Sequence, residues 1–270
     1  MERMSRVIAI ANQKGGVGKT TTAINLGAGL AVAERRTLIV DMDPQGNATS
    51  GLGIDKNRVE RSTYDVLIGA TAADDAVMKA MHFPLLDVIP SSQDLVGAEV
   101  ELVEGDEREL RLRNALASVR EAYDYVLVDC PPSLGLLTLN TLAAADTVLI
   151  PIQCEFYALE GLSQLLNTIR LVQQSLNPAL QIEGVLLTMF DQRLNLSRQV
   201  ADEAKEYFGS RVFSSVIPRN VRLAEAPSFG KPIAVYDVLS AGSQSYLALA
   251  REIIAHDAAQ AASRAAEGVA

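Results

Sequence analysis

The sequence is poor in cysteine and in long apolar runs, and each shortage excludes a class of protein. Its two cysteines, Cys130 and Cys154, form no C-x-x-C pair and lie beside apolar, strand-like runs, so buried, reduced thiols are expected and not a disulfide-rich fold. No apolar run reaches the ~18 residues that a membrane span needs. The first apolar run, Val7 to Ala11, is too short for a secretory signal. We therefore expect a cytosolic protein.

Linker-like segments are also missing. No run of glycine, serine or proline divides the chain, and no internal repeat is found. The chain has 270 residues, of which 49% are hydrophobic, enough for one large core. We expect a single domain over residues 1–256. The alanine-rich tail, 257–270, has few large apolar side chains, so it either extends the last helix or frays.

Positive charge is scarce. The chain has 24 Lys and Arg against 33 Asp and Glu, a net charge of −9, which by itself argues against nucleic acid, since such binding neutralises phosphates. The exception runs from Arg193 to Lys231, where seven basic and four acidic residues give +3 and leave −12 for the rest. Either a cationic patch lies on an acidic body or these are ordinary solvated arginines, and charge alone favours the second.

Apolar runs alternate with amphipathic stretches along the chain. Strands are predicted at residues 7–11, 37–41, 86–90, 125–129, 148–152, 182–188 and 212–217. Helices are predicted at residues 20–33, 63–69, 73–81, 107–122, 136–144, 159–174, 196–208 and 242–256, with a further short helix within 92–106. The pattern is typical of an α/β fold with a doubly wound, mostly parallel sheet. Ligands in such sheets bind at the carboxyl ends of the strands.

The most informative segment is NQKGGVGKTT at residues 12–21, which directly follows the first predicted strand. Its glycines let backbone N–H groups curl around a phosphate, and the helix N-terminus behind them adds partial positive charge. Lys19 can reach the outer phosphates, and the Thr20 hydroxyl can hold Mg²⁺. We predict a nucleoside triphosphate site formed by Lys14, Gly15, Gly16, Val17, Gly18, Lys19, Thr20 and Thr21.

Carboxylates end two other predicted strands. Asp41 and Asp43 lie in LIVDMDPQGN, and Asp129 ends VLVDCPP, which has the form of a Walker B sequence. Phosphoryl transfer needs a held metal ion and an aligned water, and carboxylates beside the phosphate loop can supply both functions. We expect Asp129 to hold Mg²⁺ and residues 131–135 to form a switch that senses the γ-phosphate. Alternatively, Asp41 or Asp43 only caps the next helix.

The phosphate loop departs from the common G-x-x-x-x-G-K-[ST] pattern, because position 13 is Gln13 and a second lysine, Lys14, follows it. KGGVGKTT resembles the deviant Walker A loop of the ParA/MinD superfamily. DMDPQGN, CEFYALEG and IPRNVRLAEAP, at residues 41–47, 154–161 and 217–227, match ParA-like ATPases further, so the likeness runs from about residue 7 to about residue 255. It is nearest to the chromosomal Soj type. A solvated lysine beside an ordinary phosphate loop is the alternative reading of Lys14.

This resemblance implies roles for individual residues. It implies ATP with Mg²⁺ as cofactors and an ATP-dependent homodimer in which Lys14 reaches the nucleotide of the partner subunit. Asp43 would position the attacking water, and Asp41 would support the metal. Pro218 and Asn220 would lie beside the adenine ring, with a simple turn role as the alternative for both.

The resemblance also implies partners. The ATP-bound dimer would bind double-stranded DNA without sequence preference through Arg193 and Arg222, and hydrolysis stimulated by a ParB-like protein would release it. We therefore expect a nucleoid-associated chromosome or plasmid partitioning ATPase that does not bind membrane. The alternatives are a MinD-like membrane-associated division-site ATPase, a metabolic ATP-dependent P-loop enzyme, a nucleotide-holding scaffold, and a form with an iron–sulfur cluster between subunits. The first is disfavoured because the C-terminal segment carries few basic residues, only Arg251 and Arg264.

Overall fold

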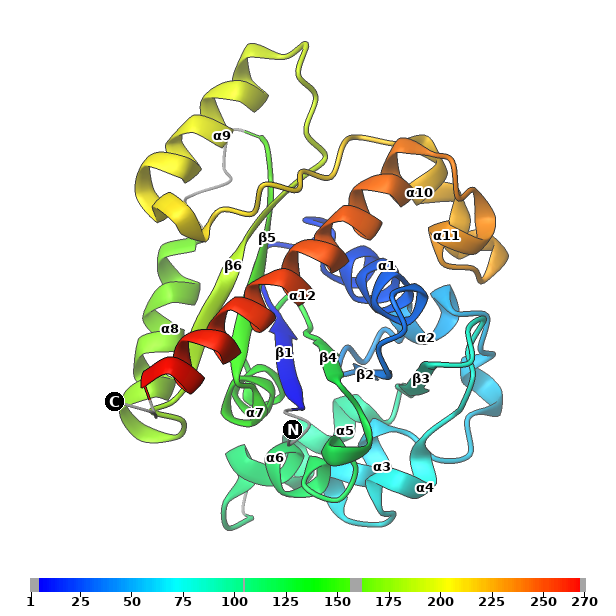
Figure 1. Cartoon of the computed structure of the whole chain (residues 1–270). Coiled ribbons are helices and arrows are strands. Elements are labelled where there is room, and N and C mark those ends of the chain that lie inside the picture. Colours follow the sequence, from blue (N-terminus) through cyan, green and yellow to red (C-terminus); the bar gives the residue numbers. More distant parts are fainter. Residues whose placement is uncertain (1–4, 104, 156–161, 268–270) are drawn as a thin grey trace.

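The computed structural model describes residues 5–103, 105–155 and 162–267 (Figure 1). A six-stranded sheet lies at its centre, with strand order β3-β2-β4-β1-β5-β6 and parallel pairing throughout. The strands are β1 (Arg6–Ile10), β2 (Thr37–Asp41), β3 (Leu86–Ile89), β4 (Tyr125–Asp129), β5 (Thr147–Gln153) and β6 (Gln181–Thr188). The predicted α/β class with a doubly wound parallel sheet is confirmed.

Helices connect and cover these strands. The α-helices are α1 (Lys19–Val32), α2 (Asn47–Gly51), α3 (Thr63–Ile68), α4 (Ala73–Ala76), α5 (Leu95–Glu101), α6 (Arg111–Leu116), α7 (Leu136–Ala144), α8 (Leu162–Ser175), α9 (Asn195–Phe208), α10 (Val221–Glu225), α11 (Ile233–Tyr236) and α12 (Ala241–Glu267). Short 3₁₀ turns are η1 (Lys56–Arg58), η2 (Arg108–Leu110), η3 (Arg120–Ala122), η4 (Gly209–Arg211) and η5 (Ala226–Phe229). The helices form a layer on each face of the sheet (Figure 1).

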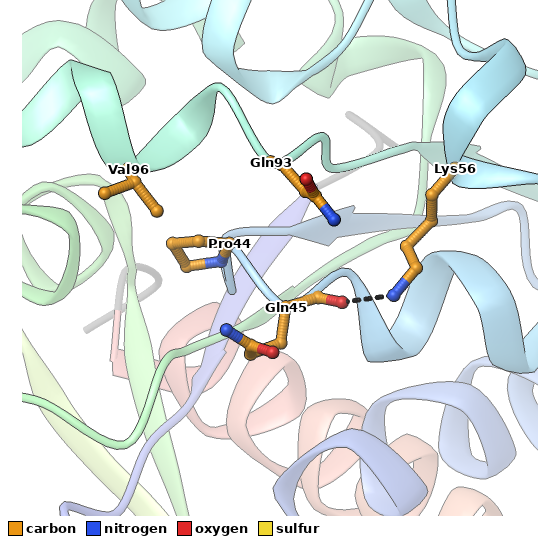
Figure 2. Close-up of a pocket in the computed structure, with 5 residues that line it drawn as sticks. All are labelled: Pro44, Gln45, Lys56, Gln93 and Val96. Carbon is orange, nitrogen blue, oxygen red and sulfur yellow. Dashed lines mark hydrogen bonds between the residues drawn. The ribbon is translucent and has the colours of Figure 1, made fainter.

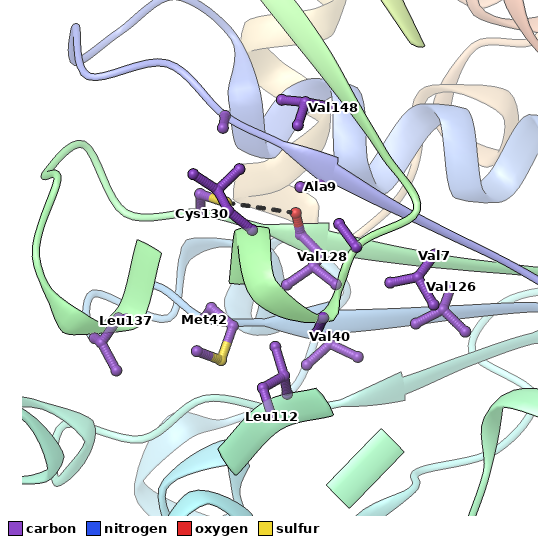
Figure 3. Packing of buried hydrophobic residues seen from close by; sticks show 14 of the residues in the cluster. Val7, Ala9, Val40, Met42, Leu112, Val126, Val128, Cys130, Leu137 and Val148 are labelled. Atoms are coloured by element: carbon purple, nitrogen blue, oxygen red, sulfur yellow. Dashed lines mark hydrogen bonds between the residues drawn. The ribbon is translucent and has the colours of Figure 1, made fainter. Parts of the chain in front are cut away.

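Alternate residues of each strand enter one of two apolar cores, because successive side chains point to opposite faces. Val40, Val126 and Val128 pack on one face, with Leu112 of α6 and Leu137 of α7 (Figure 3). The other core lies between the sheet and the helices α1 and α12, and includes Ile8, Ile39, Leu127, Leu26, Tyr246 and Leu249. Burial on both faces explains why the strand sequences are apolar throughout.

The seventh predicted strand, over residues 212–217, is wrong. The segment pairs with β6 only irregularly: Val212 forms an isolated parallel bridge with Val185, and the N–H groups of Phe213 and Ile217 donate to the Val185 and Leu187 carbonyls at 3.0 and 2.9 Å. The backbone N–H groups of Ser214 and Ser215 instead donate to the carboxylate of Glu252 in α12, at 2.7 and 2.9 Å. A side chain from another element therefore takes the donors that a regular ladder would use.

Two predicted helices are also shorter than expected. Residues 73–81 are helical only to Ala76, because Met78 forms an antiparallel bridge with Val88. Residues 107–122 split into η2, α6 and η3. Here Asn140 of α7 accepts from the Leu112 N–H at 3.1 Å and donates to the Arg108 carbonyl at 2.8 Å. Its amide replaces the direct bond that a continuous helix would form between these two groups.

The C-terminal helix is longer than its apolar positions require. α12 runs to Glu267 and so includes most of the alanine-rich tail. Asp257 ties it to the sheet, since it accepts a hydrogen bond of 2.7 Å from the hydroxyl of Tyr125 and pairs with Arg6. In the part of the chain that the structure describes, no helix is both long and apolar enough to cross a membrane. Residues 156–161 of the CEFYALEG string lie outside the described residues.

Candidate nucleotide site

The predicted site residues meet where three neighbouring strands end. Parallel register pairs Asp129 of β4 with Ile10 of β1 on one side and with Asp41 of β2 on the other. The phosphate loop follows β1 directly, so it lies beside Asp129, and Asp41 lies one strand further along the sheet. The strands therefore bring the loop, Asp41, Asp43 and Asp129 to one edge of the sheet, as the sequence predicted.

The loop over residues 12–18 is anchored at both ends. Asn12 donates to the Pro151 carbonyl at 2.8 Å and accepts from the Lys14 N–H at 3.0 Å, and Thr188 of β6 donates to the Val17 carbonyl at 2.8 Å. Gly18, with φ +91°, precedes α1 and has no side chain to cap it. The first N–H groups of α1 consequently stay available for an anion, as a phosphate site requires.

Lys19 is held inside this loop. It is only 7% exposed, and its Nζ donates to the Lys14 carbonyl at 3.2 Å. Burial lowers the pKa of Lys19, an effect that nearby Asp129 and Asp43 partly oppose. The ammonium is thus placed beneath the loop, next to the two carboxylates, where it could contact the outer phosphates of a nucleotide.

Asp129 is the least satisfied polar group of the site. It is fully buried, and neither carboxylate oxygen has a hydrogen-bond partner among the described residues. Burial raises its pKa well above the usual range, and the adjacent Asp41 raises it further, while the nearby Thr20 hydroxyl and Lys19 act in the opposite direction. A buried carboxylate without a partner is costly unless a cation compensates it. Asp129 with Thr20 therefore fits a hard cation such as Mg²⁺.

Asp41 is equally buried but fully engaged. One carboxylate oxygen accepts from the N–H and hydroxyl of Thr49 at 2.8 and 2.7 Å, and the other accepts from the Asp43 N–H at 3.2 Å. Burial raises its pKa to about 6, although the Thr49 bonds lower it. Asp41 therefore accepts hydrogen bonds from the first turn of α2, as expected for the alternative in which it caps this helix. Support of the metal by Asp41 stays a prediction.

Asp43 is fixed mainly through its backbone. One side-chain oxygen accepts from the Gln45 N–H at 2.9 Å, and its carbonyl accepts from the Ser91 hydroxyl at 2.8 Å. The Ser91 N–H donates to the Thr49 hydroxyl at 2.8 Å, which closes a buried network behind the strand end. Sequence reasoning missed Thr49 and Ser91. The position of Ser91 just after β3, at the same edge of the sheet, could have identified it.

Pro218 and Asn220 lie in the segment after residue 217. Pro218 forms an isolated bridge with Phe190, and the Asn220 side chain caps α10 by accepting from the Leu223 N–H at 3.3 Å. The described contacts therefore match the turn role, and proximity to adenine stays a prediction for both residues.

The two predicted DNA-binding arginines lie on separate exposed elements away from the loop. Arg193 precedes α9 and forms two bonds to Asp191, at 2.9 and 2.7 Å. The Arg193 guanidinium lowers the pKa of Asp191 to about 2. Arg222 of α10 pairs with Glu225 at 2.9 Å and with Asp237 at 3.6 Å. Both arginines are accessible, and both have a local carboxylate partner.

Comparison with known proteins identifies the family. A family model described as an AAA domain matches residues 5–182. The "Chromosome partitioning protein ParA" of Myxococcus xanthus is 60% identical over 257 residues, covering 94% of this chain and 89% of that protein. The chain belongs to the ParA/Soj family. The "Sporulation initiation inhibitor protein Soj" of Bacillus subtilis is also 60% identical, over 253 residues that cover 94% of this chain and 100% of that protein.

A solved structure supports the same fold. The cobyrinic acid a,c-diamide synthase of Mycobacterium smegmatis, with bound ADP and magnesium, has a TM-score of 0.82 at 39% identity, covering 94% of this chain and 95% of that chain. The resemblance stated from the motifs is thus confirmed, and this ParA/Soj protein is a P-loop ATPase of the chromosome-partitioning type. Its uncapped helix start, Lys19 and the unpartnered Asp129 fit ATP with Mg²⁺.

Proposed function

We propose that the chain partitions DNA by an ATP-driven cycle. The ATP-bound homodimer binds double-stranded DNA without sequence preference, and hydrolysis stimulated by a ParB-type partner releases it, which makes the protein nucleoid-associated. The observation that carries the proposal is Asp129, a buried carboxylate without a partner beside Lys19 and the glycine loop, in a chain 60% identical to a chromosome-partitioning ParA.

Each group of the site has a chemical task in this cycle. The N–H groups of residues 15–20 bind the phosphates, and Lys19 adds positive charge next to them. Asp129 and Thr20 would hold Mg²⁺, which would supply positive charge beside the phosphates. Asp43 accepts a hydrogen bond from the attacking water and so aligns it, because Gln45 and Ser91 restrict its movement. Lys14 extends to the nucleotide of the other subunit, so that ATP joins the two chains.

Dimerisation would convert nucleotide state into DNA affinity. Each subunit offers Arg193 and Arg222, so a dimer offers four phosphate contacts where a monomer offers two. With a slope of ~0.9 per contact on B-DNA, a fourfold rise in salt weakens monomer binding about 12-fold and dimer binding about 150-fold. Contacts to phosphates carry no base code, so the binding is independent of sequence.

The test is anisotropy of a labelled DNA duplex, measured with ATP or ADP at 50 and 200 mM salt. We expect ATP-dependent binding with the steep dimer slope, and loss of binding in Arg222→Glu with ATPase activity retained. Arg58→Glu is the control, since Arg58 is an exposed arginine of η1 that also has a local acidic partner. Binding by Arg222→Glu at the wild-type level would remove this arginine from the interface.

The dimer itself is tested by light scattering. Asp43→Ala should form a stable ATP-dependent dimer because it binds but does not cleave ATP, and Lys14→Ala should stay monomeric at the same ATP concentration. If the Asp43→Ala protein remains a monomer at saturating ATP and Mg²⁺, the proposed cycle is wrong.

A further inference from the structure

The outward side of α5 is apolar where a surface helix is normally polar. Its inward side chains, Leu95, Ala98 and Leu102, are buried in the core beneath it. Its outward positions, continued into the following turn, carry three valines that are 59%, 74% and 53% exposed: Val96, Val100 and Val103. Their spacing of four and three residues places them in one stripe. We call these three residues the valine stripe.

The sequence around the valine stripe is mostly acidic. Residues 93–107 contain six acidic side chains and no basic one, and the nearest basic residue in sequence is Arg108, which donates to the Val103 carbonyl at 2.8 Å. Of these, Asp94, Glu101, Asp106 and Glu107 are exposed. A second copy of this chain would bring the same charge against it, and like charges across an interface are strongly unfavourable. A segment that combines apolar side chains with Lys or Arg would match both the stripe and its acidic border.

On one side, α5 and the residues just before it share a hollow with the DPQGN segment that contains Asp43. Figure 2 shows Val96 and Gln93 around a hollow of about 290 Å³ that Pro44, Gln45 and Lys56 complete. Lys56 donates to the Gln45 carbonyl at 2.6 Å on the far side of this hollow. The hollow connects the valine stripe with the residues directly after the proposed water-positioning aspartate.

On its other side, α5 contacts the predicted switch segment, 131–135. The Glu99 carboxylate lies so close to Gly135 that a Cβ at this position would be 2.5 Å from Glu99 Oε1. A movement of α5 would therefore press on Gly135 and change the hollow that Gln45 lines. A partner bound to the valine stripe would contact a helix that lies between the predicted switch segment and the residues that follow Asp43.

We propose that the valine stripe and its acidic border are the surface to which a basic, amphipathic segment of the ParB-type partner docks to stimulate hydrolysis. This inference rests on the proposed function, and it assigns that function's regulation to one helix. The stripe supplies the apolar contact, and the acidic border supplies orientation and rapid association, which makes docking sensitive to salt. Pressure on α5 is then transmitted through Val96 to Gln45 and through Glu99 to Gly135.

The experiment is ATP turnover as a function of the concentration of the intact cognate ParB protein, with specific DNA present. The variant Val100→Ser/Val103→Ser changes only exposed side chains outside the nucleotide site. We expect its basal turnover and ATP-dependent dimerisation to equal those of the wild type, and its half-maximal ParB concentration to rise at least tenfold. Leu171→Ser is the matched control, because Leu171 is an equally exposed apolar residue on α8, at 56%.

A second pair of variants tests the charge. Asp106→Asn/Glu107→Gln should raise the half-maximal ParB concentration severalfold at 50 mM salt and little at 200 mM, whereas Glu121→Gln, an exposed acid at η3, should change neither value. Wild-type stimulation of the valine variant would overturn the docking surface. Loss of ATP-dependent dimerisation in that variant would overturn it too, since the second subunit would then cover the stripe. Failure of ParB to stimulate the wild type would refute the proposed partner itself.

Discussion

Replacement of Thr49 by valine tests whether the hydroxyl network behind β2 holds the catalytic edge of the sheet together. Valine has nearly the shape of threonine but has no hydroxyl group. In the structure this hydroxyl donates to Asp41 at 2.7 Å and accepts from the Ser91 N–H at 2.8 Å. All three residues are fully buried, so water has no direct access to replace the lost partner.

The expected loss of stability follows from these two bonds. A hydrogen bond to a charged group contributes about 1.5–3 kcal/mol, and a buried N–H left without an acceptor costs about 1–3 kcal/mol. Since the surroundings relax partly, we expect Thr49→Val to lower the free energy of unfolding by about 3 kcal/mol. Thr49→Ser keeps the hydroxyl and loses one methyl group, so it should cost about 1 kcal/mol.

The assay is urea unfolding of both variants at pH 7.5 without nucleotide, with equal m-values required for the comparison. Thr37→Val is the control, since Thr37 is buried at the opposite end of β2 and its hydroxyl donates only to the Arg35 carbonyl, at 3.1 Å. The difference between Thr49→Val and Thr49→Ser should be about 2 kcal/mol. Equal stability of these two variants would show that the hydroxyl contributes nothing, and the reasoning would fail.

Three further substitutions probe the site and the DNA-binding surface. Lys19→Ala should weaken ATP binding at least 100-fold, as measured by calorimetry; wild-type affinity would refute the loop assignment. Asp43→Ala should bind ATP with little change but lower kcat by about 10²–10⁴-fold in a phosphate-release assay, a range typical for a group that positions or deprotonates a nucleophile; normal turnover would exclude it from the mechanism. Asp191→Asn removes the partner of Arg193 and should tighten DNA binding slightly, because an exposed ion pair holds the guanidinium only weakly; weaker binding would contradict a competing role for Asp191.

Much of the fold could be predicted because its strands are buried on both faces. A run such as Tyr125–Asp129 has apolar residues on both sides, and no packing partner is needed to recognise it. Residues 73–81 were mispredicted because Met78 forms a backbone bridge with Val88, and the other two errors occurred where a side chain distant in sequence takes over backbone hydrogen bonds. Glu252 does so at Ser214 and Ser215, and Asn140 does so between Arg108 and Leu112. Whether a side chain replaces a backbone hydrogen-bond partner depends on tertiary contacts, so the local sequence pattern cannot reveal it.

The sequence predicted the individual residues of the site but not the hydrogen-bond network that joins them. Motif spacing placed Lys19, Asp43 and Asp129 at strand ends, and the sheet brings them to one edge. Ser91 was not predicted, because its position just after a strand points to the site only when the edge at which that strand ends is considered as well. The valine stripe was missed for a different reason: residues 92–106 were recognisable as a short helix, but which of its apolar residues faced the core depended on where the helix packed.

Asp41 and Asp129 show why residue type and burial together do not determine a role. They are paired in register on adjacent strands, and both are fully buried. Asp41 receives three hydrogen bonds from its own chain, so its charge is compensated within the fold and it organises α2. Asp129 receives none among the described residues. Nearby Lys19 and the Thr20 hydroxyl partly stabilise its charge, and a bound cation would complete the compensation. Two uncompensated carboxylates side by side would strongly oppose each other's ionisation. Because three hydrogen bonds from Thr49 and Asp43 satisfy Asp41 internally, we expect Asp129 to be the carboxylate of this pair that gains more from a bound cation.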